Sequence, residues 1–167
     1  MTDPASHLAV TIDVAAAQGV HALELWDREA SGRLAAVLGL TLPPPGRSAG
    51  DASLTAMRVE PAVWLLDGPA LVPDAIEAAL GDGGALTAIG GGLVRVRLSG
   101  PGWRGLLMAD GMFDAEDPAF GPGSVVATII AHVAVRLHVV DAQTCDAYVP
   151  ASYATGLIHG WAQLRAR

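Results

Sequence analysis

The sequence contains only one cysteine, Cys145, among its 167 residues. A single thiol excludes an internal disulfide and is typical of a protein that works in a reducing compartment. Cys145 lies in a short alternating segment, which favours a small packed side chain over a nucleophile. We therefore expect a cytoplasmic protein in which Cys145 has no chemical role.

Charge is also scarce, since 16% of the residues are charged and 51% are hydrophobic. The net charge of −7 argues against nucleic-acid binding, which requires a clustered basic face. The longest apolar stretch, 125–135, is interrupted by His132 and is shorter than the roughly 20 residues of a membrane helix. The N-terminus has neither a basic start nor an apolar block, so no secretory signal is readable. We expect no nucleic acid and no membrane, and the surplus of apolar residues suggests a protein partner.

The stretch 93–107 carries the strongest local pattern. Apolar residues alternate with Arg95 and Arg97, which predicts a half-buried strand with two arginines on its polar face. Pro101 suits the first turn of a helix, and the spacing of Trp103 with the two leucines after it gives that helix an apolar stripe. The sequence therefore predicts a strand, a tight turn and a short helix that packs back on the strand.

The rest of the sequence predicts short strands and short helices that do not alternate regularly as in a βαβ fold. Residues 1–18 show no clean period and stay unassigned, and residues 46–50 read as a loop. This pattern favours an α+β fold with mostly antiparallel sheets and short packed helices. We expect one domain over 1–167, with sub-lobes at about 51–84 and about 85–167. The predicted strands are 20–26, 55–59, 63–66, 85–89, 125–140 with a bend near Ala131 and His132, and 145–149; the predicted helices are 33–39, 73–80 and one from about Ser152.

No residue set points clearly to catalysis. The glycine run 90–92 precedes a predicted strand, whereas a phosphate-binding loop precedes a helix, so we read it as a turn. His132, Arg136 and His138 are separated by even numbers of residues, so in a strand they could lie on one face. A metal site needs three or four ligands, and the guanidinium between the two histidines would repel a cation. We interpret that face as solvated or as facing a partner.

Asp114, Glu116 and Asp117 form an acidic cluster in the loop 111–123. Paired carboxylates can act as acid and base when burial raises one pKa, but a loop rich in glycine and proline more often leaves them in water. Arg95 and Arg97 either bind an anion or an acidic partner, or simply form the wet side of their strand. We expect no catalytic residues, no metal site and no assigned cofactor-binding residue.

Several short motifs, in the right order along the chain, resemble the gamma subunit of heterotetrameric sarcosine oxidase. No one of them is diagnostic, but together they span most of the sequence. Segments 87–91 and 111–116 depart from the family pattern and leave the amine substrate open. The motifs are Leu42-Pro43-Pro44, Arg58-Val59, Trp64-Leu65-Leu66, Arg97-Leu98-Ser99-Gly100-Pro101, Leu106-Leu107, Asp117-Pro118-Ala119-Phe120, Pro122-Gly123, Ala131-His132-Val133, Leu137-His138 and Tyr148-Val149-Pro150-Ala151-Ser152-Tyr153, followed by the Trp161 helix.

The resemblance implies a non-catalytic structural subunit of a complex that oxidatively demethylates sarcosine or a related methylated amine. It implies a fold similar to the N-terminal, folate-binding region of aminomethyltransferases. It places FAD, FMN, NAD and tetrahydrofolate on larger partner subunits and no cofactor on this chain. The alternatives are a stand-alone folate-binding or aminomethyltransferase-like protein, and a chain that covers its apolar faces by forming a homodimer.

Overall fold

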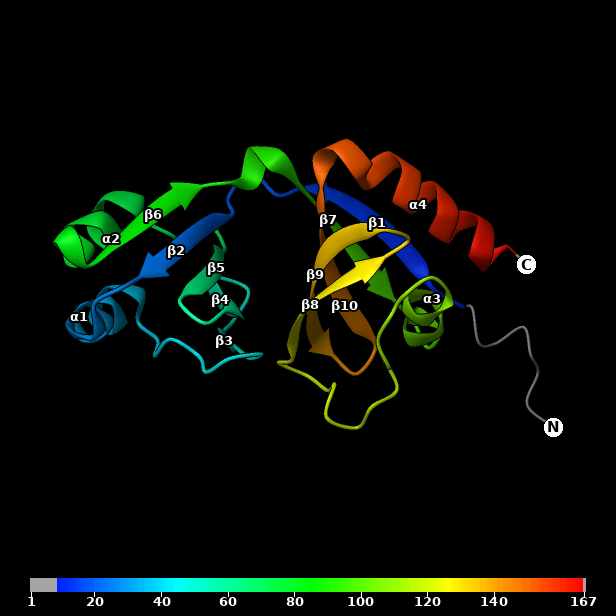
Figure 1. The fold of residues 1–167 in the computed structure, drawn as a ribbon, viewed down its shortest axis with the longest axis horizontal. Helices are drawn as coiled ribbons and strands as arrows, with labels where there is room; N and C mark the ends of the chain where they lie inside the picture. Colours follow the sequence, from blue (N-terminus) through cyan, green and yellow to red (C-terminus); the bar gives the residue numbers. More distant parts are fainter. Residues whose placement is uncertain (1–8, 167) are drawn as a thin grey trace. The chain divides into compact units, whose positions relative to one another are not determined.

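The computed structural model describes residues 9–166, and it confirms the predicted α+β class with antiparallel sheets (Figure 1). Short helices alternate irregularly with strands, as expected. The elements in chain order are β1 (Thr11–Ala16), β2 (His21–Leu25), α1 (Arg28–Leu38), β3 (Ser48–Gly50), β4 (Thr55–Glu60), β5 (Val63–Asp67), α2 (Pro73–Leu80), η2 (Gly81–Gly83), β6 (Gly84–Ala88), η3 (Gly90–Gly92), β7 (Leu93–Ser99), α3 (Trp103–Ala109), β8 (Val125–Ile130), β9 (Val133–Asp141), β10 (Thr144–Pro150) and α4 (Ala151–Arg165).

The chain divides into two compact units. Unit 1 contains the residues up to Ala16 and those from Gly92 onward, and unit 2 contains Ala17–Gly91. These bounds differ from the expected sub-lobes 51–84 and 85–167, because β2 and β6 pair with each other within the sheet of unit 2. The chain leaves unit 1 after β1 and returns to it at β7, so the two units are interleaved in sequence.

The sheet of unit 1 has the order β1-β7-β10-β9-β8, and every neighbouring pair is antiparallel. β1 falls in the region that the sequence left unassigned. It is an edge strand with most residues exposed, so its sequence lacks the clear alternation of a half-buried strand. The pairing of Ile12 with Leu98 nevertheless fixes its register on β7.

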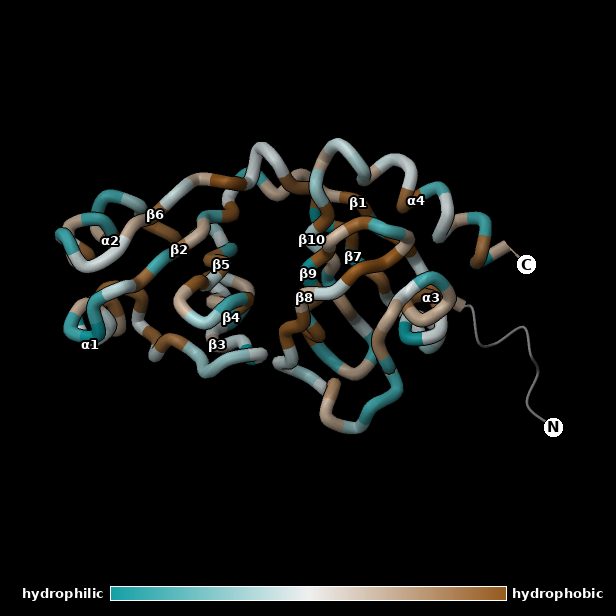
Figure 2. The backbone as a smooth tube through the Cα atoms, viewed as in Figure 1, coloured by the Kyte–Doolittle hydropathy of each residue, from teal (hydrophilic) through white to brown (hydrophobic). Residues whose placement is uncertain are grey.

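The predicted strand, turn and helix are present as β7, the turn at Gly100-Pro101 and α3. Val96 and Leu98 face the core, whereas the neighbouring Arg97 is exposed. Helices α3 and α4 supply the other side of this core, which includes Trp103 and Trp161. The hydrophobic residues of the chain are concentrated largely on its strands (Figure 2). Unit 1 is therefore a sheet with two helices on one face.

Unit 2 has the sheet order β3-β4-β5-β2-β6, with α1 and α2 contributing to a second core. The predicted start of α1 near Ser31 is wrong. Asp27 caps the helix by accepting a hydrogen bond from the backbone of Glu29, so the helix begins one turn earlier. The expected loop at 46–50 is also partly wrong, because β3 pairs with β4 there.

The predicted bend in 125–140 is a two-residue hairpin turn. Ala131 and His132 have φ angles of 47° and 66°, both in the left-handed region. Two such residues form the turn whose twist matches antiparallel strands. The bend therefore separates β8 from β9 and places Ile130 opposite Val133.

Trp103→Ala should destabilise the protein by about 3–5 kcal/mol, the usual cost of removing a large buried aromatic side chain. Trp103 is 1% exposed, its ring centroid lies 6.0 Å from that of Phe120, and its indole nitrogen donates to the carbonyl of Ala142. Urea unfolding of both proteins measures the difference. A cost below about 1 kcal/mol, typical of surface positions, would contradict the packing described for α3.

Candidate functional site

The most concentrated polar feature is a row of side chains across the sheet of unit 1. The register aligns Asp13, Arg97, Asp146 and His138 on four neighbouring strands. These side chains project from the face opposite the helices, since Cys145 and Ala147 on either side of Asp146 belong to the core. We call these four residues the polar row.

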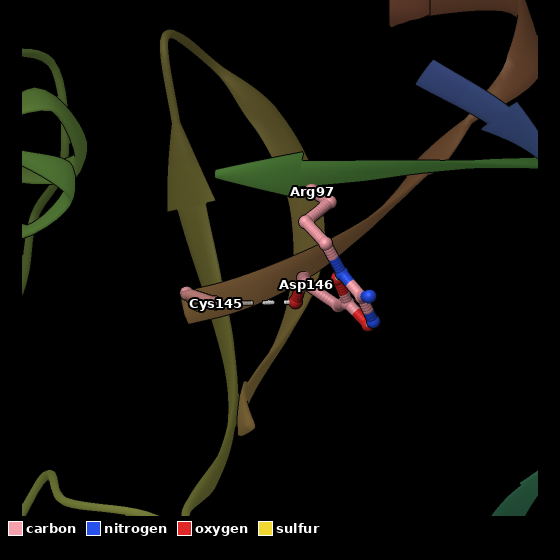
Figure 3. Close-up of polar contacts among 3 residues, drawn as sticks. All are labelled: Arg97, Cys145 and Asp146. Atoms are coloured by element: carbon pink, nitrogen blue, oxygen red, sulfur yellow. Dashed lines mark hydrogen bonds and ion pairs between the residues drawn. The ribbon is translucent and has the colours of Figure 1, made fainter. Parts of the chain in front are cut away.

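Arg97 and Asp146 form a bidentate ion pair at the centre of the polar row (Figure 3). Nε and Nη2 of Arg97 lie 2.7 Å from Oδ1 and Oδ2 of Asp146. The hydrogen bonds from Arg97 to Asp146 raise the pKa of the guanidinium. The Asp146 side chain is 3% exposed and that of Arg97 is 45% exposed. Water can hydrate the guanidinium but hardly reaches the carboxylate, so Asp146 needs its partner more than Arg97 does.

The histidine prediction is only partly correct. His138 lies in β9 and shares its face with Arg136, but His132 lies in the two-residue turn and not on that face. Arg136, Tyr148 and Arg95 form the next row across the sheet, directly opposite one another. Tyr148 is buried. The predicted polar face therefore exists, but its centre holds an ion pair with a buried carboxylate and the buried side chain of Tyr148.

Cys145 is a packed core side chain, as the sequence predicted. It is fully buried, and this burial raises the pKa of its thiol. Its Sγ lies 3.8 Å from the carbonyl oxygen of Asp146. A thiol held neutral in the core cannot supply the thiolate that nucleophilic catalysis requires.

The glycine run 90–92 forms a turn, as expected from the sequence. It is a short 3₁₀ turn, η3, followed by strand β7, so it is not a phosphate-binding loop at a helix N-terminus.

Among residues 9–166, no group of three or more His, Cys, Asp or Glu side chains could hold a metal ion. In the same range, no helix is both long and apolar enough to cross a membrane.

The carboxylates of the 111–123 loop stabilise that loop. Asp114 accepts a hydrogen bond from the backbone of Glu116 at 2.9 Å, and Asp117 accepts one from Ala119 at 2.8 Å. All three acidic residues are exposed, while Ala115 and Phe120 anchor the loop in the core. This arrangement agrees with the interpretation that the cluster is solvated.

A cavity of about 310 Å³ lies in unit 1 between α4 and the β8–β9 turn. Gly156 and Gly160 line it, and no atom approaches within 4 Å of the place where a Cβ would stand at either glycine. Asp110 is its one charged lining residue. This size is at the lower limit of small-molecule pockets, which usually place several polar groups around a ligand. With one carboxylate, the cavity does not define a catalytic site.

The structure resembles two known proteins. It matches a chain of heterotetrameric sarcosine oxidase from Corynebacterium sp. U-96, in complex with pyrrole 2-carboxylate, with a TM-score of 0.87 and 25% identity over 96% of this chain and 85% of that chain. It matches the glycine cleavage system aminomethyltransferase T from Bartonella henselae with a TM-score of 0.69 and 13% identity. The second match covers 94% of this chain and 46% of that chain, and it shows the fold alone.

No protein-family model matches the sequence, and neither does any curated protein sequence. The resemblance predicted from the motifs is thus confirmed by structure: the chain has the fold of a chain of heterotetrameric sarcosine oxidase. That protein is a heterotetramer, so its chain works with partner subunits. The fold also agrees with the predicted likeness to aminomethyltransferases.

Sequence reasoning missed the Arg97–Asp146 pair. The sequence placed Arg97 on the polar face of its own strand but did not identify its partner. Arg97 and Asp146 are 49 positions apart in the sequence, and they meet only because β7 pairs with β10. One signal for the pair was present in the sequence. Asp146 follows Cys145 in a short strand, so its side chain lies on the face opposite the packed thiol. A buried acid on a neighbouring strand is the partner that such an arginine requires.

Arg97→Met should cost more stability than Asp146→Asn. The first change leaves a buried carboxylate without its cation, which typically costs about 3 kcal/mol or more. The second leaves a guanidinium that water can reach, so we expect a loss of about 1 kcal/mol. Urea unfolding of the original protein, the two single variants and the double variant measures each loss in the free energy of unfolding. Equal and small losses would show that the pair contributes little.

Cys145 should react with a thiol reagent only when the protein unfolds. Because burial raises the pKa of this thiol, the folded protein holds almost no thiolate at pH 8. Stability should be independent of this group below about pH 7.5 and should fall as the pH rises through about 8.5, the pKa of an unfolded cysteine, because only the unfolded thiol then ionises. Labelling with and without urea gives the rates, and unfolding of Cys145→Ala gives the control. Rapid labelling of the folded protein would contradict the buried position.

Proposed function

We propose that this chain is a non-catalytic structural subunit of a sarcosine oxidase-like flavoprotein complex. The observation that carries the proposal is the match to a chain of heterotetrameric sarcosine oxidase, which covers nearly the whole of this chain and most of that one. The complex would oxidatively demethylate sarcosine or a related methylated amine. This chain corresponds to the gamma subunit in the proposal.

The chemistry of the described residues supports a structural role. Arg97 and Asp146 of the polar row are paired with each other, the thiol is buried, and the loop carboxylates Asp114 and Asp117 bind their own backbone. None of these sets combines a nucleophile with a base that orients it, which is the minimum for covalent catalysis. The side chains hold the fold together.

Exposed apolar side chains support a larger assembly. Met112 is 83% exposed, Trp26 is 64% exposed and Tyr153 is 60% exposed. Methionine and aromatic residues are enriched at the centres of protein interfaces. Burial against partner subunits would remove such surface from water, and stable complexes bury roughly 2,000 Å² or more.

In this proposal FAD, FMN, NAD and tetrahydrofolate bind to the larger subunits. The glycine run of this chain enters a strand, so it does not fit the pyrophosphate of FAD or NAD. The role left to this chain is to present a rigid surface to the cofactor-bearing subunits in the cytoplasm.

The aminomethyltransferase-like fold favours one second candidate, a stand-alone folate-binding protein. Such a protein needs a carboxylate placed to bind the pterin ring. The acidic loop offers Asp114 and Glu116, although both are exposed and Asp114 is engaged by the loop backbone. This second candidate therefore lacks a preorganised site.

Affinity purification of the full chain from its native host tests the proposal. We expect it to recover flavin-containing subunits, identified by their absorbance and by mass spectrometry. An unrelated acidic protein with the same tag serves as control. A chain that is monodisperse on its own and recovers no flavoprotein would contradict the proposal.

Equilibrium binding of tetrahydrofolate to the isolated chain tests the second candidate. A structural subunit should show no saturable binding at micromolar concentration. Saturable binding that Asp114→Asn and Glu116→Gln weaken by tenfold or more would favour the folate-binding protein. Light scattering at two concentrations of the same sample separates a monomer from a homodimer.

A further inference from the structure

The cavity between α4 and the β8–β9 turn combines a carboxylate with aromatic and apolar side chains. Asp110 is its one charged lining residue, and Tyr153 and Trp161 contribute two aromatic rings. The backbone carbonyl of Asp110 accepts from the amide of Ala131, but its carboxylate makes no hydrogen bond or ion pair with another described residue. The cavity therefore presents a negative charge that the fold itself does not use.

Trp161 brings to the same cavity a buried polar group without a partner. It is 1% exposed, the most buried of the lining residues, and its indole nitrogen has no hydrogen-bond partner within the described chain. The other three tryptophans all donate this N–H group to a backbone carbonyl oxygen. Buried N–H groups are nearly always paired, so this exception calls for an explanation. An acceptor on a molecule bound in the cavity would supply the missing partner.

Two glycines of α4 widen the cavity at the expense of the helix. Gly156 and Gly160 lie one turn apart in the helix interior, where glycine is less favourable than alanine. No atom lies within 4 Å of the place where a Cβ would stand at either residue, so the fold has room for side chains there. The packing of the chain therefore does not explain these glycines, whereas a bound molecule that lies close to the helix backbone does.

The chemistry of the lining selects a small zwitterion. A carboxylate attracts an ammonium group, and an aromatic ring such as that of Tyr153 favours an ammonium that carries methyl groups. An indole N–H binds an acceptor, and it binds a carboxylate more strongly than a neutral oxygen. The volume of about 310 Å³ is at the lower limit of small-molecule pockets, so the ligand has few atoms.

We propose that this cavity binds a small N-methylated amino acid. Its ammonium group binds Asp110 and contacts the ring of Tyr153, and its carboxylate accepts the indole N–H of Trp161. The ligand occupies the space that Gly156 and Gly160 leave open beside the helix. This inference goes beyond the proposed function, which assigns no ligand to this chain, and it does not depend on that function.

Proton–nitrogen correlation spectra of the full chain test this inference, with sarcosine as the probe. The chain has four tryptophans and hence four indole signals. We expect the signal of Trp161, assigned by its absence in Trp161→Phe, to move downfield and to saturate at millimolar sarcosine. The other three indole N–H groups already donate to carbonyl oxygens, so their signals should stay in place. A Trp161 signal that does not move would overturn the inference.

Two glycine variants and one charge variant locate the binding site. Gly156→Leu places a side chain in the cavity and should weaken sarcosine binding at least tenfold. Gly32→Leu is the matched control, because Gly32 lies in α1 of unit 2 and also has no atom within 4 Å of its Cβ position. It should bind sarcosine like the original protein. Asp110→Asn, at an exposed position, should weaken binding about tenfold, and it decides if Gly156→Leu does not fold. Unchanged affinity in either folded variant would overturn the inference.

Fragments of the probe test the ligand class. Tetramethylammonium chloride carries only the cation, sodium acetate carries only the carboxylate, and glycine lacks the methyl group. Each should bind at least tenfold more weakly than sarcosine. Binding of any of the three as tightly as sarcosine would overturn the assigned class. These titrations use the isolated full chain, so their failure leaves the proposed function standing, and the recovery of flavin-containing subunits tests that function separately.

Discussion

The antiparallel pairing of β1 with β7 is the constraint on which the chain's organisation depends. It joins Thr11–Ala16 to Val94–Ser99 and closes a loop of almost half the chain. Everything between these strands forms unit 2, with its own sheet and its own core. Closing a loop of this length costs entropy that grows only slowly with length. An inserted unit that folds on its own sheet therefore adds little to that cost.

The sequence predicted best where a pattern is local. The alternation before Pro101 and the spacing of Trp103 were sufficient for β7 and α3, because one strand face and one helix stripe share a single core. β1 was not predictable in this way, since an exposed edge strand needs no alternation. His132 lies in a turn whose two central residues, Ala131 and His132, both have positive φ angles. Such turns usually contain Asn, Asp or Gly, so nothing in the sequence strongly indicated that His132 would leave the strand face. The candidate site depended on register, and register between distant strands is a property of the folded sheet.

All ten basic residues are arginine, and several of them hold the structure together. Arg97 makes the bidentate pair, and Arg33 joins α1 to the carbonyl of Ala79 in α2. Arg58 lies over the ring of Trp64 at 4.7 Å, and Arg104 lies over that of Trp103 at 4.3 Å. A planar guanidinium can stack and bind two acceptors at once, which an ammonium group cannot do. Four of the ten cations of this acidic chain therefore take part in packing or in ion pairing within the fold.

This use of charge bears on how the chain can act in a complex. A catalytic site keeps ionisable groups available and perturbs their pKa values toward the working pH. Here burial moves the pKa of Cys145 upward, and the buried carboxylate moves the pKa of Arg97 upward, so both groups keep their ordinary protonation state at neutral pH. The ion pair between Arg97 and Asp146 also joins β7 to β10 across the middle of the sheet. A rigid sheet loses little conformational entropy when another molecule binds to it.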